Sequence, residues 1–364
     1  MVKPDIRNII LESPSGKGGD WLDNSKSMEW SDRFKMRRAS EGLLNKIGLE
    51  KKDNSYFVDA FREISKNKAF INFMESCTHC GICIDKCQMF VSTGDINNSP
   101  VGRAEIARKL YNGRGKLTID KVDLEKIYAY YYQCTECRRC SYYCPEGIDQ
   151  SEITRSVRTI LTEMGIVPDY VASTVNEAIS IGNNIGINDK AMRSMLDFIS
   201  DDMEEENGKR IDIPLNKAKS EILLVPSSAD FSVNIDTLKG YAKTMFSLGK
   251  DYTISSKASE AANFGLFLSE DYMRALGDVV VQEAVSREVR TVVWGECGHG
   301  WRAANNYVRN RLREKGIELV HMHQFTLDAY KKGKLKFDRS KNDGTYTYHD
   351  PCNYARGGNL INEP

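Results

Sequence analysis

Residues 77–87 read CTHCGICIDKC, and residues 134–145 read CTECRRCSYYCP. Each stretch has the spacing C-x2-C-x2-C-x3-C, and together they hold eight of the ten cysteines of the chain. A [4Fe–4S] cubane needs four thiolates at the corners of a tetrahedron, and two-cluster ferredoxins supply them with this spacing. The two runs therefore predict an electron-transfer module with two [4Fe–4S] clusters.

The spacing also predicts which cysteines share a cluster. Three cysteines separated by two residues wrap a loop around three corners of a cube, and the fourth lies too far along the chain, so it ligates the other cluster. One predicted set is Cys77, Cys80, Cys83 and Cys144. The other is Cys134, Cys137, Cys140 and Cys87. The alternative is a pair of zinc sites, which use C-x2-C pairs with longer spacers. With four thiolates at hand, His79 is not expected to be a ligand.

Composition restricts the class of protein. Lys and Arg total 51, as do Asp and Glu, so the chain has no net charge, which argues against a nucleic-acid partner held by a general basic field. The longest apolar stretches are about six residues, whereas a bilayer span needs about 20. The N-terminus has no apolar core of a signal peptide. We expect a soluble, cytoplasmic chain without its own transmembrane segment; any membrane anchor would belong to another subunit.

Sequence patterns divide the 364 residues into five parts. The predicted parts are a helical lead-in (1–70), the two-cluster ferredoxin-like module (71–165), a helical linker (166–212), an α/β domain (213–343) and the start of a further unit (344–364). Within the lead-in, helices are predicted over 30–47 and 56–64, with a mobile tip around residues 13–19. Apolar residues recur with a helical period over 151–164. The acidic run 201–206 is predicted to be part of a solvated linker.

The pattern changes after Ile213. Strands are predicted over 222–225, 252–254, 291–294, 317–320 and 346–348, and helices over 235–245, 272–285 and 301–315. Strands that alternate with helices form a parallel sheet. The predicted fold class is therefore α+β multidomain, a helical ferredoxin module followed by an α/β domain. Asp350-Pro351-Cys352 begins a new unit shortly before the last residue, so we expect the natural protein to be longer.

Two cysteines lie outside the runs. Cys297 and Cys352 each follow a predicted strand in a turn rich in Gly or Pro, and each has a histidine nearby, His299 and His349. Ligands of open α/β sheets collect at the carboxyl ends of strands. A lone cysteine is usually a small buried apolar side chain. The repeated pattern favours a shared redox or metal site over two such cysteines, with the histidines as proton donors near neutral pH.

Together these features resemble the HdrD-type iron–sulfur subunits of heterodisulfide reductases. Members carry a two-cluster ferredoxin module followed by two cysteine-rich CCG domains. The resemblance covers about residues 71–364 and rests on three segments: Ser-Pro-Val-Gly-Arg at 99–103, ECGHGW at 296–301 and HDPCNYAR at 349–356. The ECGHGW segment is most similar to the DsrK branch, which contains the iron–sulfur subunit of a sulfur-metabolising membrane complex.

The chain departs from the family pattern in its first CCG domain. Pro226-Ser227 stands at the place of the early cysteine, Asn263-Phe264-Gly265 at that of Cys-Cys-Gly, and Trp294 at that of the first cysteine in the final pair, of which Cys297 remains. The first CCG domain is therefore degenerate. The second begins at Cys352, and the resemblance implies that its other cysteines follow residue 364. They would form a third, noncubane [4Fe–4S] cluster with Cys352, with Cys297 as a further candidate.

The resemblance implies a subunit of a membrane-associated complex at the inner face of the cytoplasmic membrane. Electrons would come from a menaquinol-linked cytochrome b partner, pass through both cubanes and reach the third cluster, where a heterodisulfide or the trisulfide of a small sulfur-carrier protein is reduced. One alternative is the iron–sulfur subunit of a flavin-dependent hydroxyacid or glycerol-3-phosphate dehydrogenase. The flavin would then lie on a partner, since no G-x-G-x-x-G motif is present. Another alternative is a non-catalytic electron relay.

Overall fold

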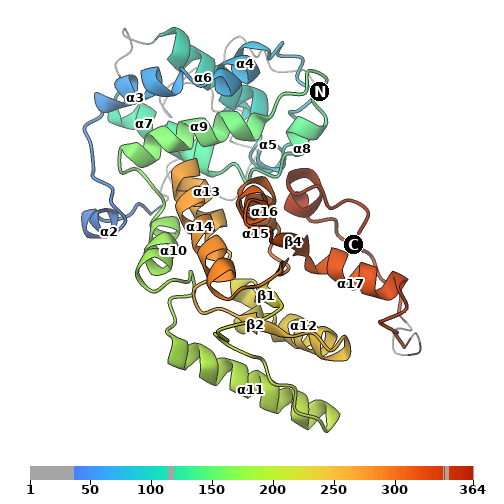
Figure 1. Ribbon diagram of the computed structural model, residues 1–364. Helices are drawn as coiled ribbons and strands as arrows, with labels where there is room; N and C mark the ends of the chain where they lie inside the picture. Colours follow the sequence, from blue (N-terminus) through green and yellow to red (C-terminus); the bar gives the residue numbers. More distant parts are fainter. Residues whose placement is uncertain (1–36, 114–118, 339, 341–343, 364) are drawn as a thin grey trace. The chain divides into compact units, whose positions relative to one another are not determined.

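The structure, a computed structural model, describes residues 37–113, 119–338, 340 and 344–363 (Figure 1). It divides into two compact units, unit 1 with residues up to 173 plus 267–269, and unit 2 with residues 174–266 and 270–364. The predicted mobile tip and most of the predicted helix 30–47 lie outside the described residues; its end is present as α2 (Glu41–Lys46).

Unit 1 is helical. Its remaining helices are α3 (Tyr56–Ile64), α4 (Lys68–Glu75), α5 (Gln88–Thr93), the 3₁₀ turn η3 (Ile96–Asn98), α6 (Pro100–Asn112), α7 (Lys121–Tyr132), α8 (Arg139–Tyr142), α9 (Gln150–Glu163) and the start of α10 (Asp169–Ser180). The amphipathic helix α9 has Asp149 as its N-cap, which accepts from the Ser151 N–H, and α9 packs against α3, α4, α6 and α7. This confirms the predicted helix.

One apolar core holds unit 1 together. Ile153, Val157 and Leu161 of α9 are fully buried in it, beside Phe61 of α3 and Phe70 of α4. Because the cysteine loops carry few apolar side chains, this core is the rigid base from which they project.

Unit 2 contains a four-stranded parallel sheet. Its strands are β1 (Ile222–Val225), β2 (Tyr252–Ile254), β3 (Thr291–Trp294) and β4 (Glu318–His321), in the order β2-β1-β3-β4. This confirms four predicted strands, the last shifted by one residue, and with them the predicted fold class. The fifth prediction was wrong, because residues 346–348 have no strand partner and lie exposed.

Helices cover both faces of this sheet. The helices assigned to unit 2, in whole or in part, are α11 (Asp189–Asn207), α12 (Ile235–Ser247), α13 (Ala262–Leu268), α14 (Glu270–Ser286), α15 (Gly298–Ala303), α16 (Arg309–Arg313) and α17 (Met322–Lys331). Ile222 and Leu224 face the core formed with α11 and α12, whereas Leu223 and Val225 face the core formed with α14 and α16. A strand that is buried on both faces has a continuous run of apolar residues. Residues 222–225, ILLV, form such a run, and the sequence therefore predicted β1 clearly.

Two helix predictions need correction. The acidic run 201–206 is not a linker but the last turns of α11, which ends at Gly208 in the left-handed conformation. Its carboxylates stay at the helix surface, and Asp202 and Glu206 pair with Lys239 of α12. The predicted helix 301–315 is interrupted by the π-helical segment η5 (Ala304–Val308), which lies between α15 and α16.

Candidate iron–sulfur centres

The eight cysteines of the two runs surround two separate cavities of unit 1. The first cavity is lined by Cys77, Cys80, Cys83 and Cys144. The second is lined by Cys87, Cys134, Cys137 and Cys140. Each cavity combines three cysteines of one run with the last cysteine of the other, which is the grouping that crossed ligation requires. Within the described part of the chain, no three His, Cys, Asp or Glu side chains meet at the position of one single metal ion.

The two cysteine loops repeat one backbone conformation. His79 and Gly81 have φ of 58° and 79°, and the equivalent residues of the second loop, Glu136 and Arg138, have φ of 50° and 57°. Non-glycine residues rarely adopt this left-handed conformation, because the Cβ crowds the following carbonyl. Alternation of left- and right-handed residues turns successive N–H groups toward one side of a loop, where they favour an anionic group.

An arginine holds the first loop. Arg108 of α6 donates to the carbonyl oxygens of Met74 (2.6 Å) and Cys77 (3.0 Å). The ring of His79 lies 2.9 Å from a carboxylate oxygen of Glu105, which fixes this left-handed residue from its side chain. The His79 ring is thus held by a side chain of α6, and that His79 is not a ligand stays a prediction.

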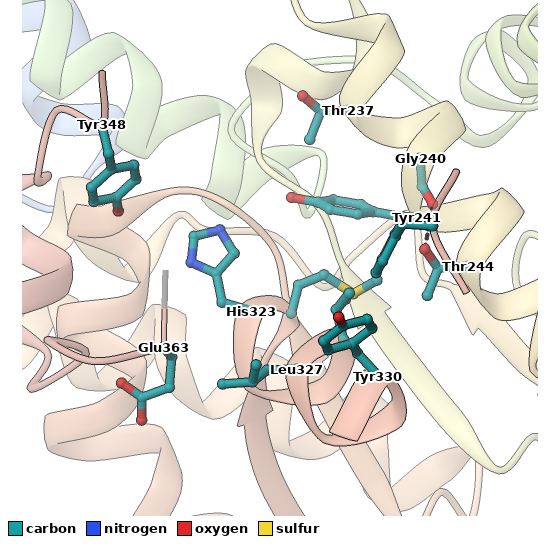
Figure 2. Close-up of a pocket in the computed structure, with 12 residues that line it drawn as sticks. Thr237, Gly240, Tyr241, Thr244, His323, Leu327, Tyr330, Tyr348 and Glu363 are labelled. Carbon is teal, nitrogen blue, oxygen red and sulfur yellow. Dashed lines mark hydrogen bonds between the residues drawn. The ribbon is translucent and has the colours of Figure 1, made fainter. Parts of the chain in front are cut away.

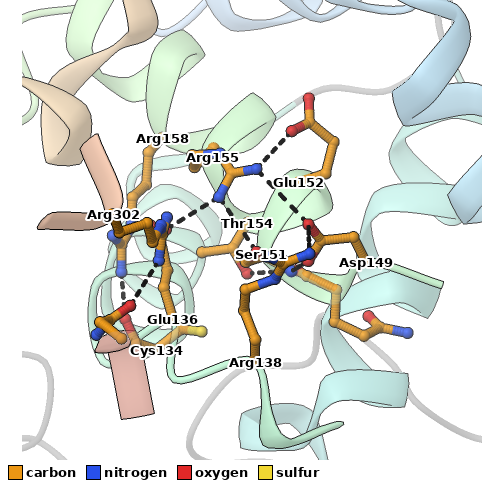
Figure 3. Close-up of polar contacts among 12 residues, drawn as sticks. Cys134, Glu136, Arg138, Asp149, Ser151, Glu152, Thr154, Arg155, Arg158 and Arg302 are labelled. Carbon is orange, nitrogen blue, oxygen red and sulfur yellow. Dashed lines mark hydrogen bonds and ion pairs between the residues drawn. The ribbon is translucent and has the colours of Figure 1, made fainter. Parts of the chain in front are cut away.

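A second arginine holds the second cysteine loop through backbone carbonyl oxygens (Figure 3). Arg158 of α9, only 1% exposed, donates to the carbonyl oxygens of Tyr131 (2.8 Å) and Cys134, and its guanidinium lies 2.5 Å from Glu136. Arg155 pairs with the same carboxylate at 3.3 Å. The buried left-handed Glu136 is therefore held by two cations of α9. The two loop-holding arginines, Arg108 and Arg158, are not evident in the sequence, because nothing in a helical pattern marks which arginine points inward.

The start of α6 contacts both cavities and explains the Ser-Pro-Val-Gly-Arg segment. Ser99 caps the helix by accepting from the Gly102 N–H at 3.0 Å. A Cβ on Gly102 would lie 2.1 Å from the Ile96 carbonyl oxygen, so only glycine fits. Val101 lines the first cavity, and its backbone acts to lower the pKa of the Cys83 thiol. Arg103 lines the second cavity, with a guanidinium nitrogen 3.8 Å from the Cys87 sulfur.

The cavities have the electrostatics of a metal-thiolate site. Burial raises the pKa of Cys83 to about 12, and it also raises the pKa of Cys77 and Cys140. A metal that binds there must displace these protons, as thiolate ligands require. Burial lowers the pKa of Arg103, but the thiolates of Cys134 and Cys87 outweigh this and raise it. A permanently charged guanidinium thus faces the second cavity, where it would offset part of the charge of four thiolates. The donor set and its surroundings fit a [4Fe–4S] cluster in each cavity.

The tyrosines before the second run are core residues. Tyr128, Tyr130 and Tyr131 are at most 2% exposed and lie in the unit 1 core. Tyr131 donates to the Arg103 carbonyl oxygen at 2.7 Å, and Tyr130 donates to Asp95 at 2.9 Å. Two of them therefore brace the segment around α6 that contacts the cavities.

In unit 2, Cys297 lies where an α/β sheet binds ligands. The chain runs from β1 outward to β2 and then returns to β3 on the other side of β1, so the topological switch point lies between β1 and β3. Cys297 follows β3 and caps α15, and its sulfur accepts from the Gly300 N–H at 3.2 Å and from the Asn263 amide at 3.3 Å. Asn263, which stands at a cysteine position of the family pattern, is thus placed beside the cysteine that remains.

Buried carboxylates surround Cys297. Glu260, 3% exposed, accepts from the Ser228 N–H at 2.9 Å and lies beside the Cys297 thiol. Burial raises the pKa of Cys297 well above its usual range, and the charge of Glu260 adds to this. Asp230, fully buried, accepts from the Ser227 N–H at 2.8 Å. Burial raises the pKa of Asp230 to about 7, and the charges of Glu296 and Glu260 act in the same direction.

Asp230 gives a testable pH dependence. Its folded pKa of about 7 lies above the ordinary 3.8, so the folded chain binds this proton more tightly than the unfolded chain, and stability falls as pH rises through this window. Asp230→Asn should leave thermal stability unchanged near pH 4 and raise it at pH 8, by up to about 4 kcal/mol at 1.36 kcal/mol per pKa unit. The control is Asp271→Asn, whose side chain is 92% exposed. Equal stability of Asp230→Asn and wild type at pH 8 would refute the assignment.

The segment of Cys352 packs beside that of Cys297. The π-helical turn η7 (Asn353–Gly357) contacts α15, and a Cβ on Gly298 would lie 3.4 Å from Asn353. The Asn353 amide donates to the Cys352 sulfur at 3.3 Å. His299 is half-buried in α15, whereas His349 is exposed in the irregular segment before Cys352. The structure thus brings the two cysteine segments together and leaves His349 at the surface.

In the part of the chain that the structure describes, no helix is both long enough and apolar enough to cross a bilayer.

Comparisons with known proteins agree with this geometry. Residues 73–148 match the 4Fe-4S dicluster domain family. The chain is 31% identical to the Hdr-like menaquinol oxidoreductase iron-sulfur subunit 2 of Archaeoglobus fulgidus, over 94% of the chain and 71% of that protein. It is also 31% identical to the Hdr-like menaquinol oxidoreductase iron-sulfur subunit of Archaeoglobus profundus, over 84% of the chain and 64% of that protein.

A more distant relative is a subunit of the dihydromethanophenazine:CoB–CoM heterodisulfide reductase of Methanosarcina mazei, 24% identical over 82% of the chain and 74% of that protein. No solved structure matches the chain at a significant level. These relatives support the Hdr-like family as a whole; the narrower DsrK branch stays a prediction.

Proposed function

Because the chain belongs to the family of Hdr-like menaquinol oxidoreductase iron–sulfur subunits, we propose that it is the subunit that carries electrons through two [4Fe–4S] clusters of an Hdr-like oxidoreductase complex. The observation that carries this proposal is the crossed grouping of eight cysteines around two cavities. Crossed grouping ties the two cavities together through both cysteine runs, which suits transfer of electrons between them.

The ligand assignment follows the cavities. Cys77, Cys80, Cys83 and Cys144 would hold one cluster. Cys87, Cys134, Cys137 and Cys140 would hold the other. When bound, such clusters supply one-electron transfer, with potentials set by hydrogen bonds to sulfur, net charge and solvent exposure.

The chain's own residues prepare these sites. Arg108 and Arg158 hold the loops, so the cysteines keep their positions. Arg103 places a cation at the second cavity, and Arg108 lies close enough to the first cavity to act on the Cys77 thiol. A cation stabilises the reduced, more negative state, so each arginine would make its site easier to reduce.

The substrate side would lie in unit 2. We assign Cys352 and Cys297 to a third, noncubane [4Fe–4S] site and His299 and His349 to proton donation for reduction of a disulfide or trisulfide. The support is the packing of η7 on α15, which places the two cysteine segments together at the switch point of the sheet. Two cysteines are fewer than a four-iron cluster takes, so this site needs ligands beyond these two.

The partners follow from the family. The names of the Archaeoglobus relatives include menaquinol, so a membrane cytochrome b-type subunit is the proposed electron donor and would place this chain at the inner face of the cytoplasmic membrane. A heterodisulfide or a small sulfur-carrier protein is the proposed acceptor. Family membership favours this assignment over the iron–sulfur subunit of a flavin-dependent dehydrogenase.

The proposal is tested on the native complex. The tagged chain is isolated anaerobically from its host with its partner subunits, a menaquinol analogue is added, and the EPR signal of reduced iron–sulfur clusters is recorded. We expect quinol to produce the signal in wild type, and the Cys83→Ser and Cys137→Ser complexes to lose quinol-dependent disulfide reduction.

A different result would identify the alternative. If a hydroxyacid reduces the clusters through a co-purifying flavoprotein and quinol does not, the chain serves a flavin-dependent dehydrogenase. If quinol reduces the clusters but Cys352→Ala changes neither the EPR spectrum nor disulfide reduction, the chain is an electron relay and the assignment of Cys352 is wrong.

A further inference from the structure

A second kind of site lies in unit 2, apart from the cysteines (Figure 2). It is an open cavity of about 540 Å³ between α12 and α17, bordered also by residues 337, 348 and 363. This volume lies within the roughly 300–1,000 Å³ that small-molecule pockets occupy. Tyr241 forms its inner wall and lies against the turn before Cys297, since a Cβ on Gly295 would be 3.3 Å from its ring.

Aromatic rings line the mouth of this cavity. Tyr330, Phe337 and Tyr348 are 45%, 61% and 59% exposed, although large apolar side chains are usually covered. The rings of Tyr330 and Phe337 lie 5.6 Å apart and tilted by 42°. Exposed rings around a concave surface favour a ligand that is itself flat and apolar, because rings gain from stacking beyond the area they bury.

Polar atoms in the cavity are few and uncharged at its centre. Burial lowers the pKa of His323, so its imidazole is neutral at pH 7. Its Nδ1 atom is buried and, among the described residues, has no hydrogen-bond partner. The other ring nitrogen, Nε2, is not among the buried polar atoms, so a ligand oxygen in the cavity can accept a hydrogen bond from the Nε2–H tautomer.

Charge excludes one class of ligand. Of the 12 described residues that line the cavity, none is lysine or arginine, and Glu363 is the acidic one. An anionic group would find no cation to compensate its loss of water and would meet a carboxylate instead. Phosphorylated cofactors and carboxylate or sulfonate substrates are therefore unsuited to this cavity.

We infer that the cavity between α12 and α17 binds an uncharged, planar aromatic compound with a carbonyl oxygen. The ring lies between the exposed aromatic side chains, and the carbonyl accepts from His323. This inference concerns binding alone and is independent of the proposed cluster function, because all the residues that carry it lie in unit 2, outside the eight cysteines.

Two probes of matched shape test whether the cavity binds a neutral ligand more tightly than an anionic one. 2-Acetylnaphthalene is a neutral aromatic ketone that does not react with thiols, and 2-naphthoate has the same ring system with a carboxylate in place of the acetyl group. Isothermal titration calorimetry on the full chain should show saturable binding of the ketone and binding of the carboxylate weaker by at least about tenfold, that is about 1.4 kcal/mol. Glu363→Gln should reduce the difference in affinity between the ketone and the carboxylate.

Three variants locate the site. A Cβ on Gly240 would meet no described atom within 4 Å, so Gly240→Leu should fold and fill the cavity, abolishing ketone binding, while Gly240→Ala should retain it. His323→Phe should weaken binding of the ketone about fivefold, since a hydrogen bond contributes about 1 kcal/mol. Phe337→Ala removes an exposed ring at the mouth and should also weaken binding without loss of thermal stability.

Three results would overturn the inference. They are no saturable ketone binding to the wild-type chain, equal affinity for the ketone and the carboxylate, and unchanged ketone affinity in both Gly240→Leu and Phe337→Ala. Loss of binding in Gly240→Leu counts as support only if its melting temperature equals that of Gly240→Ala. Cluster content and EPR spectra should be the same in all these variants, so failure here leaves the cluster proposal unaffected.

Discussion

Replacing Cys144 by serine should abolish the same cluster as replacing Cys83, although Cys144 belongs to the other cysteine run. Both side chains line the first cavity. Each variant should lose about four iron atoms, those of one cubane, because a cubane takes four ligands and no further cysteine lines the cavity. The remaining EPR spectrum should be the same in both variants.

The reciprocal pair provides the control. Cys87→Ser and Cys137→Ser affect the second cavity, so their common spectrum should differ from that of the first pair. Cys297→Ser, in unit 2, should leave both cubane signals unchanged. If Cys144→Ser resembles Cys137→Ser instead, each run holds its own cluster and the crossed assignment is wrong.

Replacing Arg158 by methionine should cause the largest loss of stability in unit 1. Arg158 is 1% exposed, pairs with the equally buried Glu136 and donates to the carbonyl oxygens of Tyr131 and Cys134. Breaking a buried pair by removing one partner costs about 3–5 kcal/mol, because the other charge stays buried. We expect the cluster absorbance to be lost at a clearly lower temperature on anaerobic heating, together with faster loss of iron.

Two further variants separate charge from packing. Arg155→Met removes the more exposed cation of the pair around Glu136, at 3.3 Å, and should cost less. Adding Glu136→Gln to Arg158→Met should recover part of the loss, since the buried carboxylate that has lost its nearest cation is then neutral. An effect of Arg158→Met below about 1 kcal/mol, the level of an exposed ion pair, would show that the guanidinium does not hold the loop.

How much the sequence predicts depends on the range of the interactions. The cysteine grouping follows from spacing, because three thiolates in a short loop leave the fourth corner to a distant residue. Strands such as Ile222–Val225 were predicted because residues buried on both faces are all apolar. The helix α9 was predicted from its period and its capping aspartate.

Interactions between residues far apart in the sequence were not predicted. Tyr346–Tyr348 alternates like a strand, but no neighbouring strand pairs with it in the described residues, so the pattern alone was misleading. The acidic end of α11 has the composition of a linker, yet a helix forms because Met203 is buried and Asp202 pairs with Lys239 across to α12. Arg158 looks like any helical arginine until the fold places Glu136 beside it.

The site in unit 2 was predicted in part. The end of β3 identified Cys297, whereas the strand predicted before Cys352 did not form; the two segments are nevertheless packed together through α15 and η7. The buried carboxylates of Asp230 and Glu260 were missed, because an acidic residue in a loop is expected to be exposed. Asp230 follows β1, Glu260 follows β2 and Cys297 follows β3. These residues meet only because the three strand ends lie at one edge of the sheet, and no local sequence pattern predicts that.

The most direct test is a metal and sulfide analysis of the Cys352→Ala chain prepared without oxygen, so that the count reports on the two cavities of unit 1. Two [4Fe–4S] clusters predict about eight iron atoms and about eight acid-labile sulfides per chain, with negligible zinc. About two zinc atoms with neither iron nor sulfide would contradict the assignment of both cavities and with it the proposed electron transfer.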